Sequence, residues 1–358
     1  MTGYYNMTPR EHFLAQAAER ILITDGAFGT EIQNWRLDEA AYAGDLGLGH
    51  DQKGNNDILA LTRPAVPDAI TRAYLDAGAD MVSTNTFSAN RISQADYGAE
   101  GLVREINVAS ARIARAAADD YAARDGRPRF VAGALGPTNK TLSLSPDVND
   151  PGYREIDFDY LKAVYREQID ALVAPEAGGG VDFVLIETVF DTLNAKAGIM
   201  AALEAQDDLG RDLPIMLSMT LTDLSGRNLS GHTVEAFWHA VRHARPLTIG
   251  LNCSFGAEQL RPHVRTLSDI CDALIMVYPN AGLPNELGAY DEEPATTAKL
   301  VGEWAQAGQV NVLGGCCGST PAHIAAIAEA VRGLPARRLP VPAVRTRLAG
   351  LEPMTMAA

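Results

Sequence analysis

Two adjacent cysteines, Cys316 and Cys317, stand in a glycine-rich run near the end of the sequence, LGGCCG. A third cysteine, Cys253, lies well upstream in the segment LNCS. Each site follows a short apolar run that predicts a buried strand. Three protein ligands around one metal ion, with a fourth position left open, are the layout of a catalytic zinc site. A substrate thiol that filled the open position would become a thiolate at neutral pH.

The glycines beside the cysteine pair bear on whether both thiols can face one ion. Consecutive residues of a strand point to opposite faces, so the backbone must turn between the two cysteines. Gly314, Gly315 and Gly318 permit such a turn. A disulfide between the two neighbours is the strained alternative. Soft thiolates select zinc over magnesium or calcium. The remaining cysteine, Cys271, is interpreted as a small buried hydrophobe.

Two carboxylates also follow apolar runs, Asp25 in TDGAFGT and Glu187 in IET. If both lie at one end of a barrel, they could bind an ammonium group, and backbone N–H groups of residues 26–29 could hold a carboxylate. A helix cap or a loop salt bridge is the ordinary alternative for each acid. The functional interpretation predicts a small amino acid that carries a thiol as the ligand.

Apolar runs that are continuous rather than alternating predict buried parallel strands, and helical stretches rich in Ala, Glu and Arg separate them. The runs are residues 21–24, 81–84, 130–134, 183–186, 215–219, 248–251, 274–277 and 310–313. The helical stretches include residues 67–77, 102–118, 160–174, 192–205, 233–243 and 321–331. Eight alternations predict an α/β fold, a (β/α)8 TIM barrel, whose C-terminal strand ends would gather the polar residues. A doubly wound open sheet is the second interpretation.

Two segments are longer than simple connections, residues 31–63 and residues 137–159. Long loops at an active-site face are often lids or binding surfaces, and an ordinary solvated excursion is the alternative. We predict irregular structure at residues 44–54. The sequence from residue 335 is rich in Pro and Arg, so we predict a barrel domain at 1–334 and a linker-like tail at 335–358.

The composition argues against several classes of partner. The 358 residues carry a formal net charge of −15, and no basic stripe is present, so nucleic acid is not an expected partner. The first 13 residues lack the basic and apolar regions of a signal peptide, and no membrane span is predicted. Four cysteines are too few for a disulfide scaffold, which favours the reducing cytoplasm. Neither G-x-G-x-x-G nor a P-loop occurs.

Eight segments together resemble the homocysteine-binding module of cobalamin-dependent methionine synthase, within the homocysteine S-methyltransferase superfamily. They are TDGAFGTEIQ, GNNDILALTRP, AYLDAGADMVSTNTFSANR, GALGPTNKTLSLSPDV, LIETVFDTLNAKAGI, GLNCSFGAEQLRPHV, YPNAGLPN and VLGGCCGSTPAHI. They occur in the family's order and cover nearly the whole chain. The resemblance implies a (β/α)8 barrel, zinc as the metal and homocysteine as the substrate.

The resemblance also assigns roles to residues. It implies Cys253, Cys316 and Cys317 as zinc ligands, with Asn280 as a candidate fourth ligand when substrate is absent. Candidate contacts of homocysteine are the residues of three strand ends, namely Asp25, Gly26, Ala27, Glu187, Thr188 and Asn252.

The implied reaction is methyl transfer from methylcobalamin to homocysteine, giving methionine. No cobalamin-binding D-x-H-x-x-G is present, and residues 345–353 resemble the linker before a folate domain. We favour a split subunit that works with a separate cobalamin- and folate-binding polypeptide, and a fragment of a longer protein is the alternative. Betaine or S-methylmethionine as methyl donor is one alternative. A non-catalytic zinc or thiol sensor is an alternative of another class.

Overall fold

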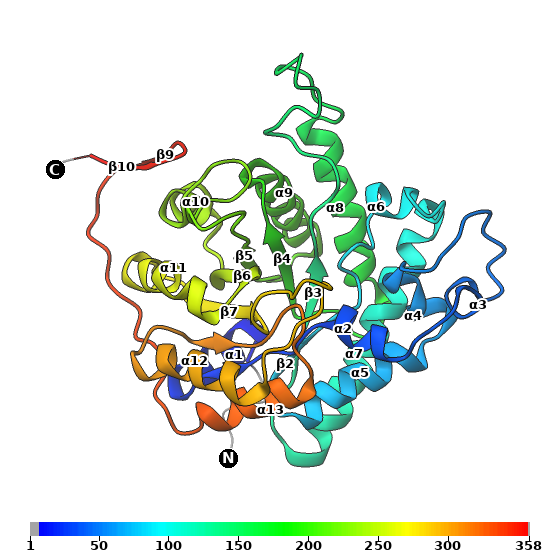
Figure 1. Cartoon of the computed structure of the whole chain (residues 1–358), viewed down its shortest axis with the longest axis horizontal. Coiled ribbons are helices and arrows are strands. Elements are labelled where there is room, and N and C mark those ends of the chain that lie inside the picture. The colour runs from blue at the N-terminus through cyan, green and yellow to red at the C-terminus, as the bar shows by residue number, and fades with distance from the viewer. Residues whose placement is uncertain (1–6, 357–358) are drawn as a thin grey trace.

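The computed structural model describes residues 7–356. The prediction that no signal peptide is present concerns residues 1–13, and the first six of these lie outside the described residues. Eight parallel strands of the described chain form one sheet that surrounds a central axis (Figure 1). The strands are β1 (Leu22–Ile23), β2 (Met81–Ser83), β3 (Phe130–Leu135), β4 (Phe183–Val189), β5 (Ile215–Met219), β6 (Thr248–Gly256), β7 (Leu274–Asn280) and β8 (Val312–Leu313).

The order of the strands closes the sheet into a barrel. Each strand from β2 to β8 pairs with its sequence neighbour, and β8 pairs in parallel with β1. A parallel bridge between Thr24 and Met81 joins β1 to β2. The prediction of an α/β (β/α)8 TIM barrel is therefore confirmed. The doubly wound open sheet is excluded because such a sheet has two unpaired edges.

Helices cover the outside of the barrel (Figure 1). The α-helices are α1 (Pro9–Glu19), α2 (Phe28–Asn34), α3 (Glu39–Ala43), α4 (Leu59–Thr62), α5 (Ala65–Asp76), α6 (Arg91–Ala95), α7 (Val103–Asp125), α8 (Phe158–Leu172), α9 (Thr192–Leu209), α10 (Val234–Val241), α11 (Ala257–Ile270), α12 (Pro294–Gln306) and α13 (Pro321–Ala330). Short 3₁₀ turns are η1 (Asn56–Ile58), η2 (Glu100–Leu102), η3 (Pro175–Ala177) and η4 (Arg242–Ala244). None of the helices within residues 7–356 combines the length and apolarity that crossing a membrane requires.

The strands are apolar on both faces because each face packs against something. On β4, Phe183 and Leu185 belong to the core inside the barrel, and Val184 and Ile186 belong to the core under the helices. Phe13 of α1 is fully buried and packs edge-on against Phe130 and Phe183, with ring centroids 5.2 and 5.1 Å away. Helix α1 thus plugs the N-terminal end of the barrel, which we call the floor. Burial of one such side chain stabilises the fold by roughly 1.5–3 kcal/mol.

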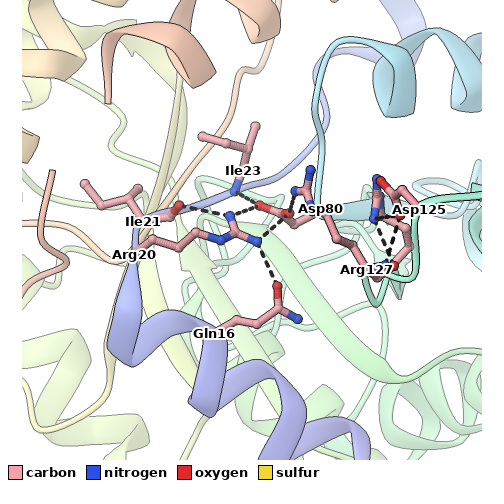
Figure 2. A network of polar contacts seen from close by, with 8 residues as sticks. Gln16, Arg20, Ile21, Ile23, Asp80, Asp125 and Arg127 are labelled. Carbon is pink, nitrogen blue, oxygen red and sulfur yellow. Dashed lines mark hydrogen bonds and ion pairs between the residues drawn. The ribbon is translucent and has the colours of Figure 1, made fainter. Parts of the chain in front are cut away.

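A buried carboxylate anchors the floor (Figure 2). Asp80, just before β2, is fully buried and accepts hydrogen bonds from Arg20 at 2.7 and 2.8 Å and from Arg127 at 2.9 Å. The backbone N–H of Ile23 donates to the same carboxylate at 3.0 Å. The chain itself therefore supplies the cations that a buried carboxylate needs. These bonds also tie β1 to the start of β2.

The two long segments contribute to the opposite end of the barrel, which we call the mouth. Residues 44–54 contain neither helix nor strand, as predicted. The amides of Asn55 and Gln94 donate to each other at 2.9 and 3.0 Å, and both side chains are buried. Residues 54–57 and 137–139 line the cavity of the mouth. Parts of both long segments therefore belong to the cavity wall, and a role as binding surface stays a prediction.

The tail beyond residue 334 returns to the barrel. Arg337 is buried and donates to the carbonyls of Ser268, Cys271 and Ala273. A small antiparallel hairpin of β9 (Arg347–Ala349) and β10 (Pro353–Thr355) packs against α10. The division into domains at 1–334 and 335–358 stays a prediction.

Candidate metal centre and active site

The C-terminal ends of the strands surround a cavity of about 960 Å³. Among the described residues, no Lys, Arg or His lines it. Its ionisable lining comprises the three clustered thiols, three tyrosines and four carboxyls, those of Asp25, Asp57, Asp96 and Glu187. The described lining has no basic side chain that could pair with these carboxyls, so a bound ligand would have to supply any cation.

The three predicted cysteines converge on one point of the cavity. The sulfur atoms of Cys253, Cys316 and Cys317 all lie within 4.8 Å of one another, and Cys253 Sγ is 3.7 Å from Cys317 Sγ. Cys253 belongs to the end of β6, and the other two follow β8. The cluster could hold one metal ion.

The backbone is distorted where it presents these thiols. Cys253 and Ser254 have φ angles of 61° and 58°, and Thr188 on the neighbouring barrel wall has a φ of 55°. Left-handed conformations at residues other than glycine cost about 1–3 kcal/mol each and collect at functional sites. The distortion turns the end of β6 away from regular pairing, where its register with β7 shifts.

Close approach of the backbone explains the glycines of the cysteine run. A Cβ atom on Gly314 would lie 2.3 Å from Thr24 Cγ2, and one on Gly315 would lie 2.3 Å from Ser319 Oγ. Gly318 has a φ of +80°, which permits the turn after the cysteine pair. The Ser319 N–H donates to the Cys316 carbonyl at 2.9 Å, so a backbone turn spans residues 316–319 and begins at Cys316.

Hydrogen bonds between the thiols already favour one thiolate. Hydrogen bonds from Cys253 and Cys316, and then from the Tyr290 hydroxyl, lower the pKa of Cys317. The pKa of Cys316 is raised because its thiol donates to its two neighbours and is buried. A soft cation would replace the shared protons and accept all three sulfurs.

Asn280, at the end of β7, has a buried polar atom that no group of the described chain bonds. Its side chain is 2% exposed, and its Oδ1 atom is buried without a hydrogen-bond partner among the described residues. Its Nδ2 donates to the Tyr290 hydroxyl at 3.4 Å. Buried amide oxygens are nearly always satisfied. The three thiols form a donor set that fits zinc, and Asn280 Oδ1, on strand β7 between β6 and β8, is a further unpartnered oxygen although Asn280 does not line the cavity.

Asp25 and Glu187 lie in the same cavity. Asp25 accepts hydrogen bonds from the backbone N–H of Ser83 at 2.6 Å and from its hydroxyl at 3.2 Å. Glu187 accepts from the Tyr278 hydroxyl at 3.0 Å. Burial raises the pKa of Asp25 to about 6 and that of Glu187 to about 7. Both acids lack an ion pair within the described chain, so an incoming ammonium group would stabilise their charged forms.

The other predicted contact residues divide into two groups. Gly26, Ala27 and Thr188 line the cavity. Asn252 does not line it, because its amide is engaged in the wall. Its Oδ1 accepts from Thr188 N at 3.1 Å and from Ser218 Oγ at 2.7 Å, and its Nδ2 lies 3.8 Å from Cys316 Sγ. Asn252 therefore positions Thr188 and a thiol.

Sequence reasoning missed four residues of the site, Asp57, Ser83, Tyr278 and Tyr290, all of which line the cavity. Tyr278 lies inside an apolar strand, where an aromatic residue reads as core. Tyr290 belongs to a loop whose path no local pattern indicates. One signal was available for Ser83 and Asp57, because both lie within segments that carry the family resemblance. Ser83 is the last residue of β2, and Asp57 belongs to η1.

A family profile described as Homocysteine S-methyltransferase matches residues 22–331. This is most of the sequence, and the chain belongs to the homocysteine S-methyltransferase family. The family supports assignment as a methyltransferase, and the predicted resemblance to this family is confirmed.

Solved structures agree in fold. The metallated form of the homocysteine methyltransferase MmuM from Escherichia coli is 23% identical, with a TM-score of 0.68 over 90% of this chain and 99% of that chain. Its apo form is 22% identical, with a TM-score of 0.63 over 90% of this chain and 100% of that chain. At these identities the likeness concerns the architecture.

Proposed function

We propose that this chain is a zinc-dependent homocysteine S-methyltransferase module of the methionine synthase type, acting in the cytoplasm. The convergence of three thiols and the unpartnered Asn280 Oδ1 beside two carboxyls without cations is the observation that carries the proposal. Cys253, Cys316 and Cys317 would hold zinc, with Asn280 as the fourth ligand when substrate is absent. Bound zinc would supply a Lewis acid that lowers the pKa of the homocysteine thiol.

The protein's own residues then orient the substrate. The carboxyls of Asp25 and Glu187 receive the ammonium group, and the backbone beside Gly26 and Ala27 faces the substrate carboxylate. Tyr278 keeps Glu187 in place through its hydroxyl. When its ammonium and carboxylate groups are both held, the amino acid presents its sulfur to the methyl donor from one direction. This fixed orientation lowers the entropic part of the barrier. No general base is needed once the thiol proton is gone.

The methyl donor we propose is methylcobalamin, carried by a separate cobalamin- and folate-binding polypeptide. The segments GNNDILALTRP and PTNKTLSLSPDV, which resemble the cobalamin-dependent branch, support this choice. Both segments contribute to the cavity wall. A small cationic donor, S-methylmethionine, is the second candidate, because the cavity wall has four carboxyls and lacks basic side chains within the described chain.

The test combines metal analysis with turnover. Purified protein should contain zinc and form methionine from homocysteine with methylcobalamin, and calorimetry should detect zinc-dependent proton release when homocysteine binds. Turnover with betaine or S-methylmethionine but none with methylcobalamin would reverse the ranking of donors. A zinc or thiol sensor would bind metal without coupling homocysteine binding to proton release.

A further inference from the structure

The cavity of the mouth is much larger than the homocysteine site needs. Pockets for drug-sized ligands occupy roughly 300–1,000 Å³, and this one measures about 960 Å³. Beyond the thiols it extends over polar residues that follow β2 and β3 and over the 54–57 segment. These residues are outside the proposed zinc and homocysteine site, and the mechanism above gives them no role.

Asp57 stands out in this region because its carboxyl is buried and nearly unpartnered. The residue is 4% exposed and lines the cavity. Besides its own backbone N–H, the group of the described chain that bonds it is the backbone N–H of Ser88, at a long 3.4 Å. Burial raises its pKa to about 7. A buried carboxyl this poorly satisfied is costly unless a ligand completes it.

The surrounding frame holds Asp57 in place. The preceding carbonyl, that of Asn56, accepts from Asn85 Nδ2 at 2.8 Å. One residue earlier, Asn55 is locked by its reciprocal amide pair with Gln94. The carboxyl is therefore presented to the cavity by a rigid wall. It does not lie on a loop that could turn it out to water.

The ionisable neighbours of Asp57 supply no cation. Burial raises the pKa of Tyr97, and the nearby charge of Asp57 raises it further. Asp96, at the exposed rim of the same wall, is bonded by Asn139 Nδ2 at 3.1 Å. Lysine, arginine and histidine are absent from the cavity lining within residues 7–356. A complementary ligand would bring hydrogen-bond donors such as N–H groups, and an anionic group beside Asp57 would be repelled.

We propose that Asp57 is a binding residue for an N–H-bearing group of the methyl donor. This inference rests on the proposed function and deepens it. Two donors carry such groups, the primary amides at the rim of a methylcorrinoid and the ammonium group of S-methylmethionine. In either case Asp57 would accept a hydrogen bond from the donor while the zinc and homocysteine site lies elsewhere in the same cavity.

The first experiment uses Asp57→Asn, which preserves size and removes the acceptor charge. At saturating homocysteine, we expect KM for the true donor to rise about tenfold or more, as for loss of a hydrogen bond to a charged group. Homocysteine affinity and zinc content should stay at wild-type values. Asp96→Asn is the matched control, because it removes the same charge from the rim of the same cavity and leaves Asp57 intact. An equal rise in both variants would reduce the effect to general electrostatics and overturn the proposal.

The second experiment leaves the protein unchanged and alters the donor, so it does not depend on how a variant folds. Methylcobinamide, which keeps the corrinoid amides and lacks the nucleotide, is compared with methylated heptamethyl cobyrinate, which also lacks the nucleotide and has esters in place of the amides. S-methylmethionine is compared with 4-(dimethylsulfonio)butanoate, which has the same chain length and lacks the ammonium group. Weaker binding of the analogue of one donor, measured by equilibrium dialysis as well as by KM, would support the proposal and identify that donor.

Failure of this inference is separable from failure of the proposed function. If Asp57→Asn and the wild type have the same donor KM while homocysteine still binds with zinc-dependent proton release, Asp57 is a structural residue and the inference is wrong. If homocysteine does not bind to the wild type in a zinc-dependent manner, the proposed function is wrong and the inference falls with it.

Discussion

The floor and the mouth of the barrel treat buried carboxyls in opposite ways. At the floor, Asp80 is bonded by Arg20, Arg127 and a backbone N–H (Figure 2). At the mouth, Asp25 is buried and Glu187 is half-buried, but their partners are hydroxyl groups and a backbone N–H. The floor therefore neutralises its charge with the chain's own cations. The mouth leaves its charge for a ligand to neutralise.

This difference separates stability from function within one barrel. In barrels of this class the C-terminal strand ends carry the chemistry and the N-terminal ends carry stability. The same division places left-handed residues such as Cys253 and Thr188 at the mouth. Substitutions at the two ends should therefore change different measurable quantities.

The largest effect is expected from removal of one thiolate at the mouth. Cys316→Ala should lose its metal to a stoichiometric amount of EDTA and lose turnover, because a site with two thiolates binds zinc far more weakly. Far-UV circular dichroism should remain that of a folded barrel. Cys271→Ala is the matched control, since Cys271 is buried away from the cluster. Retention of full activity in Cys316→Ala would contradict the assignment of the metal centre.

Breaking the charge cluster at the floor should come next. Asp80→Ala should lower the free energy of unfolding by about 3 kcal/mol, because two arginines and the Ile23 N–H lose their acceptor. Urea denaturation gives this value. Zinc content and homocysteine affinity of the folded variant should not change, since the floor lies across the barrel from the cavity. An unchanged urea denaturation midpoint would mean that Asp80 does not stabilise the fold, and the contrast between a stabilising floor and a functional mouth would be wrong.

Glu187→Gln should produce the converse result. Homocysteine affinity should fall about tenfold or more, as expected for loss of a charged hydrogen-bond acceptor. The free energy of unfolding should stay constant or rise, because an unpaired buried charge is removed. Isothermal titration calorimetry and urea denaturation measure the two quantities. A variant that loses stability and keeps its affinity would mean that Glu187 behaves like Asp80.

Tyr278→Phe, which removes only one hydrogen bond to Glu187, should have a smaller effect on homocysteine affinity than Glu187→Gln.

The last prediction is a pH dependence of stability that originates at the mouth. Burial raises the pKa of Glu187 from 4.5 to about 7 and that of Asp25 from 3.8 to about 6. Between these values the folded state binds more protons than the unfolded state, so their contribution to the free energy of unfolding falls as pH rises. Homocysteine affinity should rise over the same range, because the ammonium group needs charged partners. In Glu187→Gln the stability of the ligand-free protein should depend less on pH between about 4.5 and 7. An identical slope in the two proteins would assign the effect to other groups.

Much of the fold could be predicted from local pattern. The apolar runs are continuous because every strand is covered on both faces, and the run at residues 215–219 coincides with β5. Strand ends were harder, since β6 extends to Gly256 through a left-handed Cys253 that an apolar run does not indicate. The sequence indicated the length of the insertion at residues 31–63 and its irregular part. Its contact with the cavity could not be predicted, because it depends on the amide pair between Asn55 and the distant Gln94.

The sequence by itself determined the alternation of strand and helix, the three thiols in their glycine setting and the two acids at strand ends. These follow from residue type and spacing, which act over a few neighbours. Only the tertiary structure decided that Tyr278 supports Glu187 and that Asn252 braces Thr188 and a thiol. It also decided that Asn280 Oδ1 has no hydrogen-bond partner within residues 7–356, and that the Asp57 carboxyl is bonded there by backbone N–H groups alone. Such relations join residues far apart in the chain, and whether a buried polar atom is satisfied depends on every element packed around it.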